Sequence, residues 1–128
     1  MSVDGTGAGA PASQAGVAAP MMETIGDELL DQALAERRAL VQLCLYALDR
    51  ARSAGVVERI EAGLADIGVR AVRPDGDRFD PSRHEAGGVV PTDDPSLEGV
   101  VAETEVVGFV DRERPLRPPI VTVYTAKA

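Results

Sequence analysis

The hydrophobic pattern of this 128-residue chain changes once, near Val72, from the spacing of helices to the spacing of strands. Before Val72, apolar residues recur three and four positions apart, which gathers them on one face of a helix. After Val72 come short runs rich in Val and Thr, which favour strands. Helices followed by strands indicate an α+β fold. We expect an N-terminal antiparallel helical hairpin or bundle followed by a small antiparallel β-domain.

The first helix is expected to begin near Thr24, whose hydroxyl can cap a helix start, and to stop at Gly55. A second helix is expected over about residues 56–67, ended by Gly68. The short connection predicts an antiparallel pair. The first helix carries a wide apolar stripe that a lone hairpin and a small sheet leave partly uncovered, which predicts a helix-mediated homodimer. The residues assigned to this interface are Leu30, Leu34, Val41, Leu45 and Leu48.

The β-domain is expected to contain several short strands joined by tight turns. Its middle run has one face predicted to be buried and another, with Glu103 and Glu105, predicted to face water. The predicted strands cover residues 89–90, 100–107 and 120–125. The face predicted to be buried comprises Val100, Ala102, Thr104 and Val106.

Turns are expected at residues 92–99 and 111–115, where polar residues, Gly and Pro gather. Asp80 followed by Pro81 is typical of a helix start, so residues 81–86 are expected to form a single helical turn. The N-terminus offers almost nothing to bury, which predicts disorder. The expected parts are a disordered tail over residues 1–20, a helical hairpin over residues 21–70 and a β-domain over residues 71–128.

The charge and the single cysteine limit the classes of partner and compartment. A net charge of −8 opposes binding to nucleic acid and to anionic membrane surfaces. No apolar stretch approaches the roughly 20 residues that span a bilayer. Cys44 is alone, so an intramolecular disulfide is impossible and a reducing compartment fits. With no signal peptide in view, we expect a soluble, cytoplasmic protein.

Catalytic, metal and cofactor sites are not predicted. His84 is the only histidine, and a metal or general-base site would need convergent partners that scattered acids do not supply. Asp93-Asp94 and the Glu103/Glu105 pair are better explained by a solvated loop and strand face than by glycosidase carboxylates. A small enzyme is therefore kept only as a third hypothesis, behind the two binding functions described below.

Two separated motifs carry a resemblance to a known family. The first runs from Phe79 to Ala86: an aromatic residue, Asp-Pro, two free positions, His, one free position and Ala. The second begins about twenty residues later with Gly and an aromatic, and ends on an apolar-Arg pair and an alternating apolar strand. With the two motifs in this order and at this spacing, the chain resembles the GrpE family over roughly residues 40–128. The motif residues, interpreted as scaffold, are Phe79, Asp80, Pro81, His84, Ala86, Gly108, Leu116, Arg117 and Val121.

The resemblance implies a binding protein and not an enzyme: a nucleotide exchange factor that binds the nucleotide-binding domain of a DnaK-type chaperone and promotes ADP release. The expected partner-contacting residues are Phe109, Arg114 and Val123, and Arg114 matches a basic position of the family beside a tight turn. The resemblance implies no cofactor.

Departures from the family pattern keep an alternative open. Gly87 stands where the family has an apolar residue, and Pro115 stands at a strand position. Since Pro lacks the N–H that a strand donates, Pro115 and Pro119 are expected at an edge or a bulge. Only about residues 22–39 stand in for the family's long N-terminal helix. The alternative is a GrpE-derived interaction module that binds a diverged chaperone-like partner without exchange activity.

Overall fold

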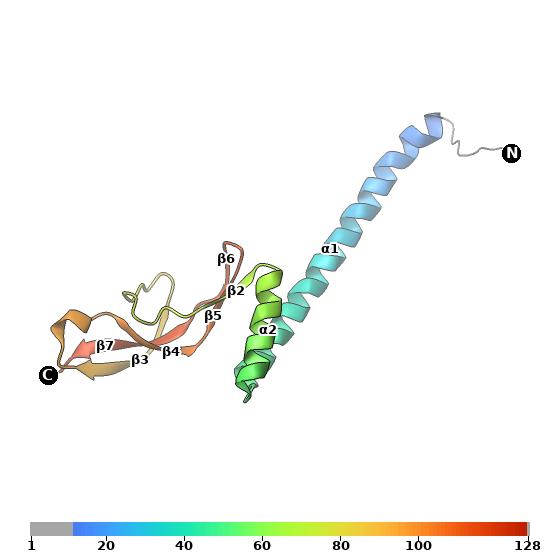
Figure 1. Ribbon diagram of the computed structural model, residues 1–128. Coiled ribbons are helices and arrows are strands. Elements are labelled where there is room, and N and C mark those ends of the chain that lie inside the picture. The colour runs from blue at the N-terminus through green and yellow to red at the C-terminus, as the bar shows by residue number, and fades with distance from the viewer. Residues whose placement is uncertain (1–11, 128) are drawn as a thin grey trace. The chain divides into compact units, whose positions relative to one another are not determined.

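The computed structural model describes residues 12–127, with side chains from residue 19 onward. The chain divides into two compact units, Met1–Leu43 and Cys44–Ala128. The helix α1 (Ala12–Arg50) forms the first unit and contributes its last residues to the second. Figure 1 shows the two helices followed by strands, so the predicted α+β class is confirmed.

The start of α1 differs from the prediction. The helix already includes Ala12, and Thr24 lies inside it, where its hydroxyl donates a hydrogen bond to the Pro20 carbonyl oxygen at 3.0 Å. Thr24 is therefore no cap. Residues 1–11 of the predicted disordered tail lie outside the described residues, whereas residues 12–20 belong to α1. Alanine is the best helix former, so an Ala-rich segment can extend a helix even though it has little to bury.

The end of α1 and the start of α2 (Ala54–Asp66) also lie differently from the prediction. α1 ends at Arg50, and Gly55 lies in the first turn of α2 instead of stopping α1. Ser53 caps α2 by accepting a hydrogen bond from the Val56 N–H at 3.3 Å. A hydroxyl at the cap position outweighs the glycine as a local signal because it satisfies a free helix N–H. The predicted end at Gly68 is confirmed, with φ of 91°.

The strands form two three-stranded sheets. In the first, β5 (Gly108–Asp111) lies between β2 (Val69–Val72) and β6 (Arg114–Arg117), and both pairs are antiparallel. In the second, β7 (Ile120–Ala126) lies between β3 (Glu85–Thr92) and β4 (Val101–Val106). β3 and β7 are parallel. The predicted small β-domain is present and mainly antiparallel, and this one pair differs because β3 reaches β7 by a crossover through the intervening strands.

Several segment boundaries correct the prediction. β2 starts at Val69, within the predicted helical part, and β6 starts at Arg114, within a predicted turn. The predicted helical turn over residues 81–86 is a non-helical turn, since β3 begins at Glu85. The predicted turn over residues 92–99 holds a short 3₁₀ helix, Pro95–Leu97, capped by Asp94.

The core of the second unit is small and aliphatic. α2 packs against β2, and Leu64 of α2 is 4% exposed. In β4 the alternation of half-buried and exposed residues from Ala102 onward fits the prediction, but Val101 is buried in place of Val100. An irregularity in the pairing with β7 between Val101 and Glu103 explains this shift, because an extra residue moves side chains to the other face. The fully buried side chains are Phe109, Val69, Val101 and Val121.

Candidate functional site

Arg117, at the end of β6, joins three parts of the second unit. Its two terminal nitrogens donate hydrogen bonds to the Asp49 carboxylate at 2.8 Å each, and its Nε donates to the Val107 carbonyl oxygen at 2.9 Å. The guanidinium also lies over the Phe109 ring, 5.4 Å from its centroid. Bidentate pairing of arginine with a carboxylate fixes the orientation of the two groups and is stronger than a single hydrogen bond. Arg117 therefore fastens the end of α1 to β5 and β6.

The electrostatics of this pair follow from its geometry. Hydrogen bonding by Arg117 holds the pKa of Asp49 below its ordinary value, with Arg50 adding a smaller charge effect in the same direction. Asp49 lies in the last turn of α1, where the helix dipole disfavours an anion. The tertiary partner offsets that local penalty, so the pair depends on the β-domain being folded.

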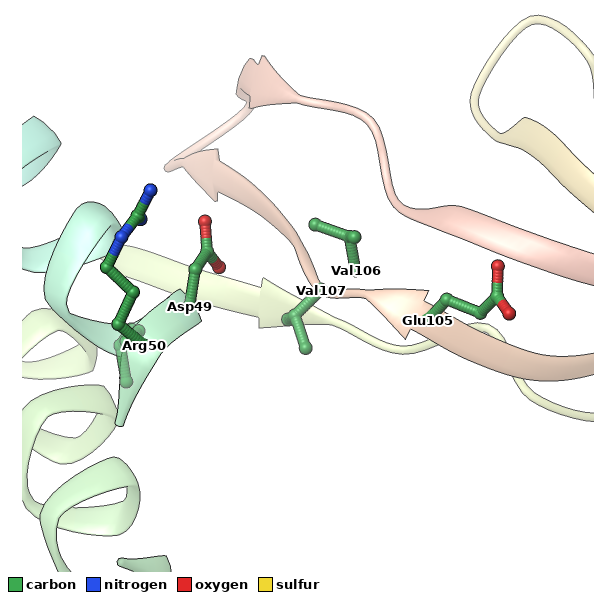
Figure 2. A pocket seen from close by; sticks show the side chains of 6 residues that line it. Asp49, Arg50, Glu105, Val106 and Val107 are labelled. Carbon is green, nitrogen blue, oxygen red and sulfur yellow. The ribbon is translucent and has the colours of Figure 1, made fainter. Parts of the chain in front are cut away.

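A shallow hollow of about 520 Å³ lies beside this ion pair. Figure 2 shows Asp49 and Arg50 at the helix end, with Glu105 of β4 on the far side and Val106 and Val107 between them. The Asp49 carboxylate is already held by Arg117. Leu48 completes the lining. The hollow thus presents a polar helix end beside a strand and offers no converging set of reactive groups.

Gly108 and Pro119 approach each other too closely for any side chain on Gly108. A Cβ built on Gly108 would lie 2.5 Å from the Pro119 Cδ and 2.6 Å from its nitrogen. Both residues are buried. Pro119 lies between β6 and β7, and Pro115 lies in the edge strand β6, so neither removes a hydrogen bond from a central strand. The prediction of an edge or a bulge is confirmed for Pro115, whereas Pro119 lies outside the strands.

The first motif forms a turn docked on the second sheet. The Phe79 N–H donates to the Gly99 carbonyl oxygen at 2.8 Å, and the Phe79 ring contacts that of His84 at 5.8 Å between centroids. The Asp80 N–H donates to His84 Nδ1 at 3.0 Å, and Asp80 Oδ1 accepts from the Ser82 N–H at 2.9 Å. The hydrogen bond from the Ser82 hydroxyl, and after it that from the Ser82 N–H, lowers the pKa of Asp80. Phe79 is half-buried and joins this turn to the sheet, in keeping with its interpretation as a scaffold residue.

The residues expected to contact a partner differ in accessibility. Arg114 is exposed and Val123, in the central strand β7, is half-buried. Phe109 is 1% exposed beneath Arg117. A direct contact by Phe109 would require the sheet to open, so its expected role as a contact does not fit the structure. Its ring supports the Arg117 guanidinium instead.

The residues expected at a dimer interface also separate into two groups. Leu30 is 57% exposed and Leu34 is 43% exposed. Val41 and Leu45 are already buried within the chain, and Leu48 lines the hollow beside Asp49. The first unit exposes further large apolar side chains, which the turn of about 100° per residue places on another side of the helix from Leu30 and Leu34. The exposed apolar surface of α1 comprises Met21, Met22, Ile25, Leu29, Leu30, Leu34, Leu40 and Leu43.

The described residues contain neither a group of metal ligands nor a helix that could cross a membrane. Across residues 12–127, no three His, Cys, Asp or Glu side chains lie where they could share a metal ion. In the same part of the chain, each helix is too short or too polar to cross a bilayer.

Comparison with known proteins places both motifs within one matched domain. The sequence model of the GrpE family matches residues 55–125, a stretch that includes nearly all of α2 and every strand. The chain belongs to the GrpE family. Both motifs singled out from the sequence lie within the matched stretch, so the structural roles of Asp80, Gly108 and Arg117 are roles within a GrpE domain.

Individual relatives carry the same name. Protein GrpE of Trichormus variabilis is 40% identical over 73 residues, covering 57% of this chain and 29% of that protein. Protein GrpE of Thioalkalivibrio sulfidiphilus is 38% identical over 90 residues, covering 62% and 48%. Protein GrpE of Nitrosomonas eutropha is 29% identical over 99 residues, covering 77% and 47%. The chain thus spans less than half the length of these curated relatives.

Sequence reasoning missed one member of the site, Asp49. Its pairing with Arg117 joins residues 68 positions apart, which periodicity cannot reveal. A signal was nevertheless present, because an aspartate in the last turn of a helix is locally unfavourable and therefore indicates a partner elsewhere. The arginine was identified by its motif, but only the fold supplies its counterion.

Proposed function

We propose that this chain is a nucleotide exchange factor: it binds the nucleotide-binding domain of a DnaK-type chaperone and promotes release of ADP. The observation that carries the proposal is the GrpE match over residues 55–125, which includes nearly the whole β-domain. The second unit supports it, since the residues of both motifs form the folded scaffold of its β-domain.

The mechanism follows from differential affinity. A protein that binds the open form of the chaperone's nucleotide cleft better than the closed form shifts the cleft toward opening, by no more than that difference in affinity. The open cleft makes fewer contacts to ADP, so ADP dissociates faster. No covalent bond changes, and the chain acts through contact alone.

The proposed contact surface is the exposed part of the first sheet and the adjoining β7. Arg114 is exposed at the start of β6, and the half-buried Val123 lies on β7. Phe109 supports this surface from below, because its buried ring holds the Arg117 guanidinium. Arg117 in turn fixes the surface relative to the end of α1 through Asp49.

The direct test is release of fluorescent ADP from a DnaK-type chaperone of the same organism. Adding this chain at micromolar concentration should accelerate release in a saturable way. A release rate that stays at its basal value, while a known exchange factor accelerates it under the same conditions, would contradict the proposal.

The second candidate is an interaction module without exchange activity. Pro115 favours it, since a proline on the edge strand β6 alters the backbone that borders the proposed contact surface. Under this alternative the chain would bind a chaperone-like partner in a pull-down while ADP release stayed at its basal rate. Accelerated release would exclude it.

We further propose that two copies associate through the exposed apolar surface of α1. Its eight large apolar side chains between Met21 and Leu43 are each at least 43% exposed, and a monomer seldom leaves so many large apolar side chains in water. Leu30 and Leu34 belong to this surface, whereas Val41 and Leu45 are buried within one chain and stabilise it there. The cytoplasmic location stays a prediction.

A further inference from the structure

The hairpin between β5 and β6 turns on an arginine in an unusual backbone conformation. Asp111 pairs with Arg114, so Arg112 and Glu113 form the two-residue turn. Arg112 has φ of 57° and is the only residue other than glycine with a positive φ among residues 12–127. Glycine, asparagine and aspartate adopt this left-handed conformation most readily, and arginine is disfavoured there. The turn therefore holds an arginine in a backbone conformation that arginine disfavours.

The backbone and the side chain of Arg112 both lie against Gly68. The Arg112 N–H donates to the Gly68 carbonyl oxygen at 2.8 Å, a bond that any residue except proline would make. A Cβ built on Gly68 would lie 3.2 Å from the Arg112 Cγ, 3.5 Å from its Nε and 3.7 Å from its Cζ, so the guanidinium passes over this glycine. The side chain is nevertheless 74% exposed, and its ion pair with Asp111 spans 3.6 Å. Such an exposed pair contributes little.

The surroundings of Arg112 are locally basic although the chain carries a net charge of −8. Arg114 is exposed two positions further on, and Arg70 is exposed on the neighbouring strand β2, where it pairs with Val110. Asp111 is largely covered, with a side chain that is 18% exposed. Glu113 is the one exposed acid within the turn. The accessible side chains of the hairpin tip thus present more positive than negative charge.

We propose that Arg112 is a partner-contacting residue that acts with Arg114 to recognise an acidic patch on the chaperone's nucleotide-binding domain. This inference rests on the proposed exchange function. Arginine pairs with carboxylates through two parallel N–H donors, so two arginines at one hairpin tip fit a pair of surface carboxylates. Charges at the rim of an interface act mainly on the association rate and on its salt dependence. Arg112 therefore speeds association with the acidic patch, most strongly at low salt.

The test compares four variants in binding to the chaperone's nucleotide-binding domain, each with its melting temperature measured. Arg112→Gln removes the positive charge but still places a side chain at a backbone position with positive φ. Arg112→Lys keeps the charge. Arg112→Gly removes the charge and the backbone penalty together. Arg83→Gln is the matched control, since Arg83 is an exposed arginine elsewhere in the β-domain.

We expect Arg112→Gln to weaken binding about threefold to tenfold at low salt, with a smaller effect at high salt. Arg112→Lys should retain most of the affinity, and Arg83→Gln should bind like the wild type. Arg112→Gly should melt at an equal or higher temperature and still bind weakly, which separates contact from stability.

The inference is overturned if Arg112→Gln binds like the wild type, or if Arg83→Gln weakens binding as much. Both results leave the proposed function intact, because the wild type binds in each. A wild type that does not bind the chaperone at all removes the proposed function, and the role of Arg112 with it.

Discussion

Arg117 concentrates several interactions on one side chain, and its loss should be felt in the free energy of unfolding. We expect Arg117→Ala to lower this free energy by about 1–2 kcal/mol, since it removes two hydrogen bonds to a partly exposed carboxylate and the contact with the Phe109 ring. Urea denaturation measures the change. Arg114→Ala is the control and should change the free energy by less than about 0.5 kcal/mol. Equal stabilities of the two variants would refute the role of Arg117.

The lowered pKa of Asp49 predicts how stability depends on pH. Because Arg117 keeps the folded-state pKa of Asp49 below 3.8, the unfolded chain binds more protons as the solution becomes acidic. This contribution is complete above the unfolded-state pKa and is lost as the pH falls through the folded-state pKa. The free energy of unfolding should therefore fall between about pH 5 and pH 3, and Asp49→Asn should make this fall shallower.

The pH curve of Asp49→Asn should not become flat. The pKa values of Asp80 and Asp94 are also lowered, in each case chiefly by the serine two positions further on, and both remain in the variant. A pH dependence identical to that of the wild type would mean that the Asp49–Arg117 pair contributes nothing to folding.

At the residue scale, sequence reasoning identified side chains more reliably than their surroundings. Asp80 was expected to cap, and it does accept hydrogen bonds from Ser82, but in a turn instead of a helix. Phe109 was expected at the surface and is buried. A short local pattern fixes the bonds a residue makes with its neighbours in sequence, whereas burial depends on which distant strands cover it.

The placement of β5 against the segment before β7 depends on a glycine. We expect Gly108→Ala to destabilise the chain by about 2 kcal/mol or more, because its Cβ would meet the backbone and ring of Pro119 at less than 3 Å. Gly88→Ala in β3 is a matched control, since its Cβ would lie 3.7 Å from the nearest side-chain atom. Thermal unfolding should separate the two variants. An equal melting temperature would show that β5 and Pro119 can move apart at little cost.

At the element scale, the residue pattern predicted the two long helices and three of the strands, β3, β4 and β7. The strands β2, β5 and β6 were not predicted, because each contains four residues, too few for an alternating pattern to stand out. The parallel pairing of β3 with β7 was missed because each strand looks the same from its own residues in either orientation. Pro115 was placed at an edge because its chemistry excludes a central position.

Association of two copies can be tested on the exposed apolar surface of α1. We expect light scattering to report a dimer for the wild type and a monomer for the double variant Leu30→Glu with Leu34→Glu, because burying two carboxylates should weaken association roughly tenfold or more. Gln42→Glu is the control, since Gln42 is an exposed polar residue of the same helix. A wild type that is monomeric at all concentrations would contradict the proposal.

For the whole molecule, the family was identified from its motifs, and the structure explains what those motifs do. Asp80 and His84 build a turn docked on the second sheet, Gly108 allows Pro119 to approach, and Arg117 holds Asp49. These roles are structural, so the motifs identify the domain more directly than its contact surface.

The rate of ADP release from a DnaK-type chaperone tests the central proposal most directly. The rate should rise with the concentration of this chain and saturate, and Arg114→Ala should require a higher concentration to reach the same rate while its melting temperature stays unchanged. A release rate that does not respond to the wild-type chain, with a responsive chaperone confirmed by another exchange factor, would contradict the account.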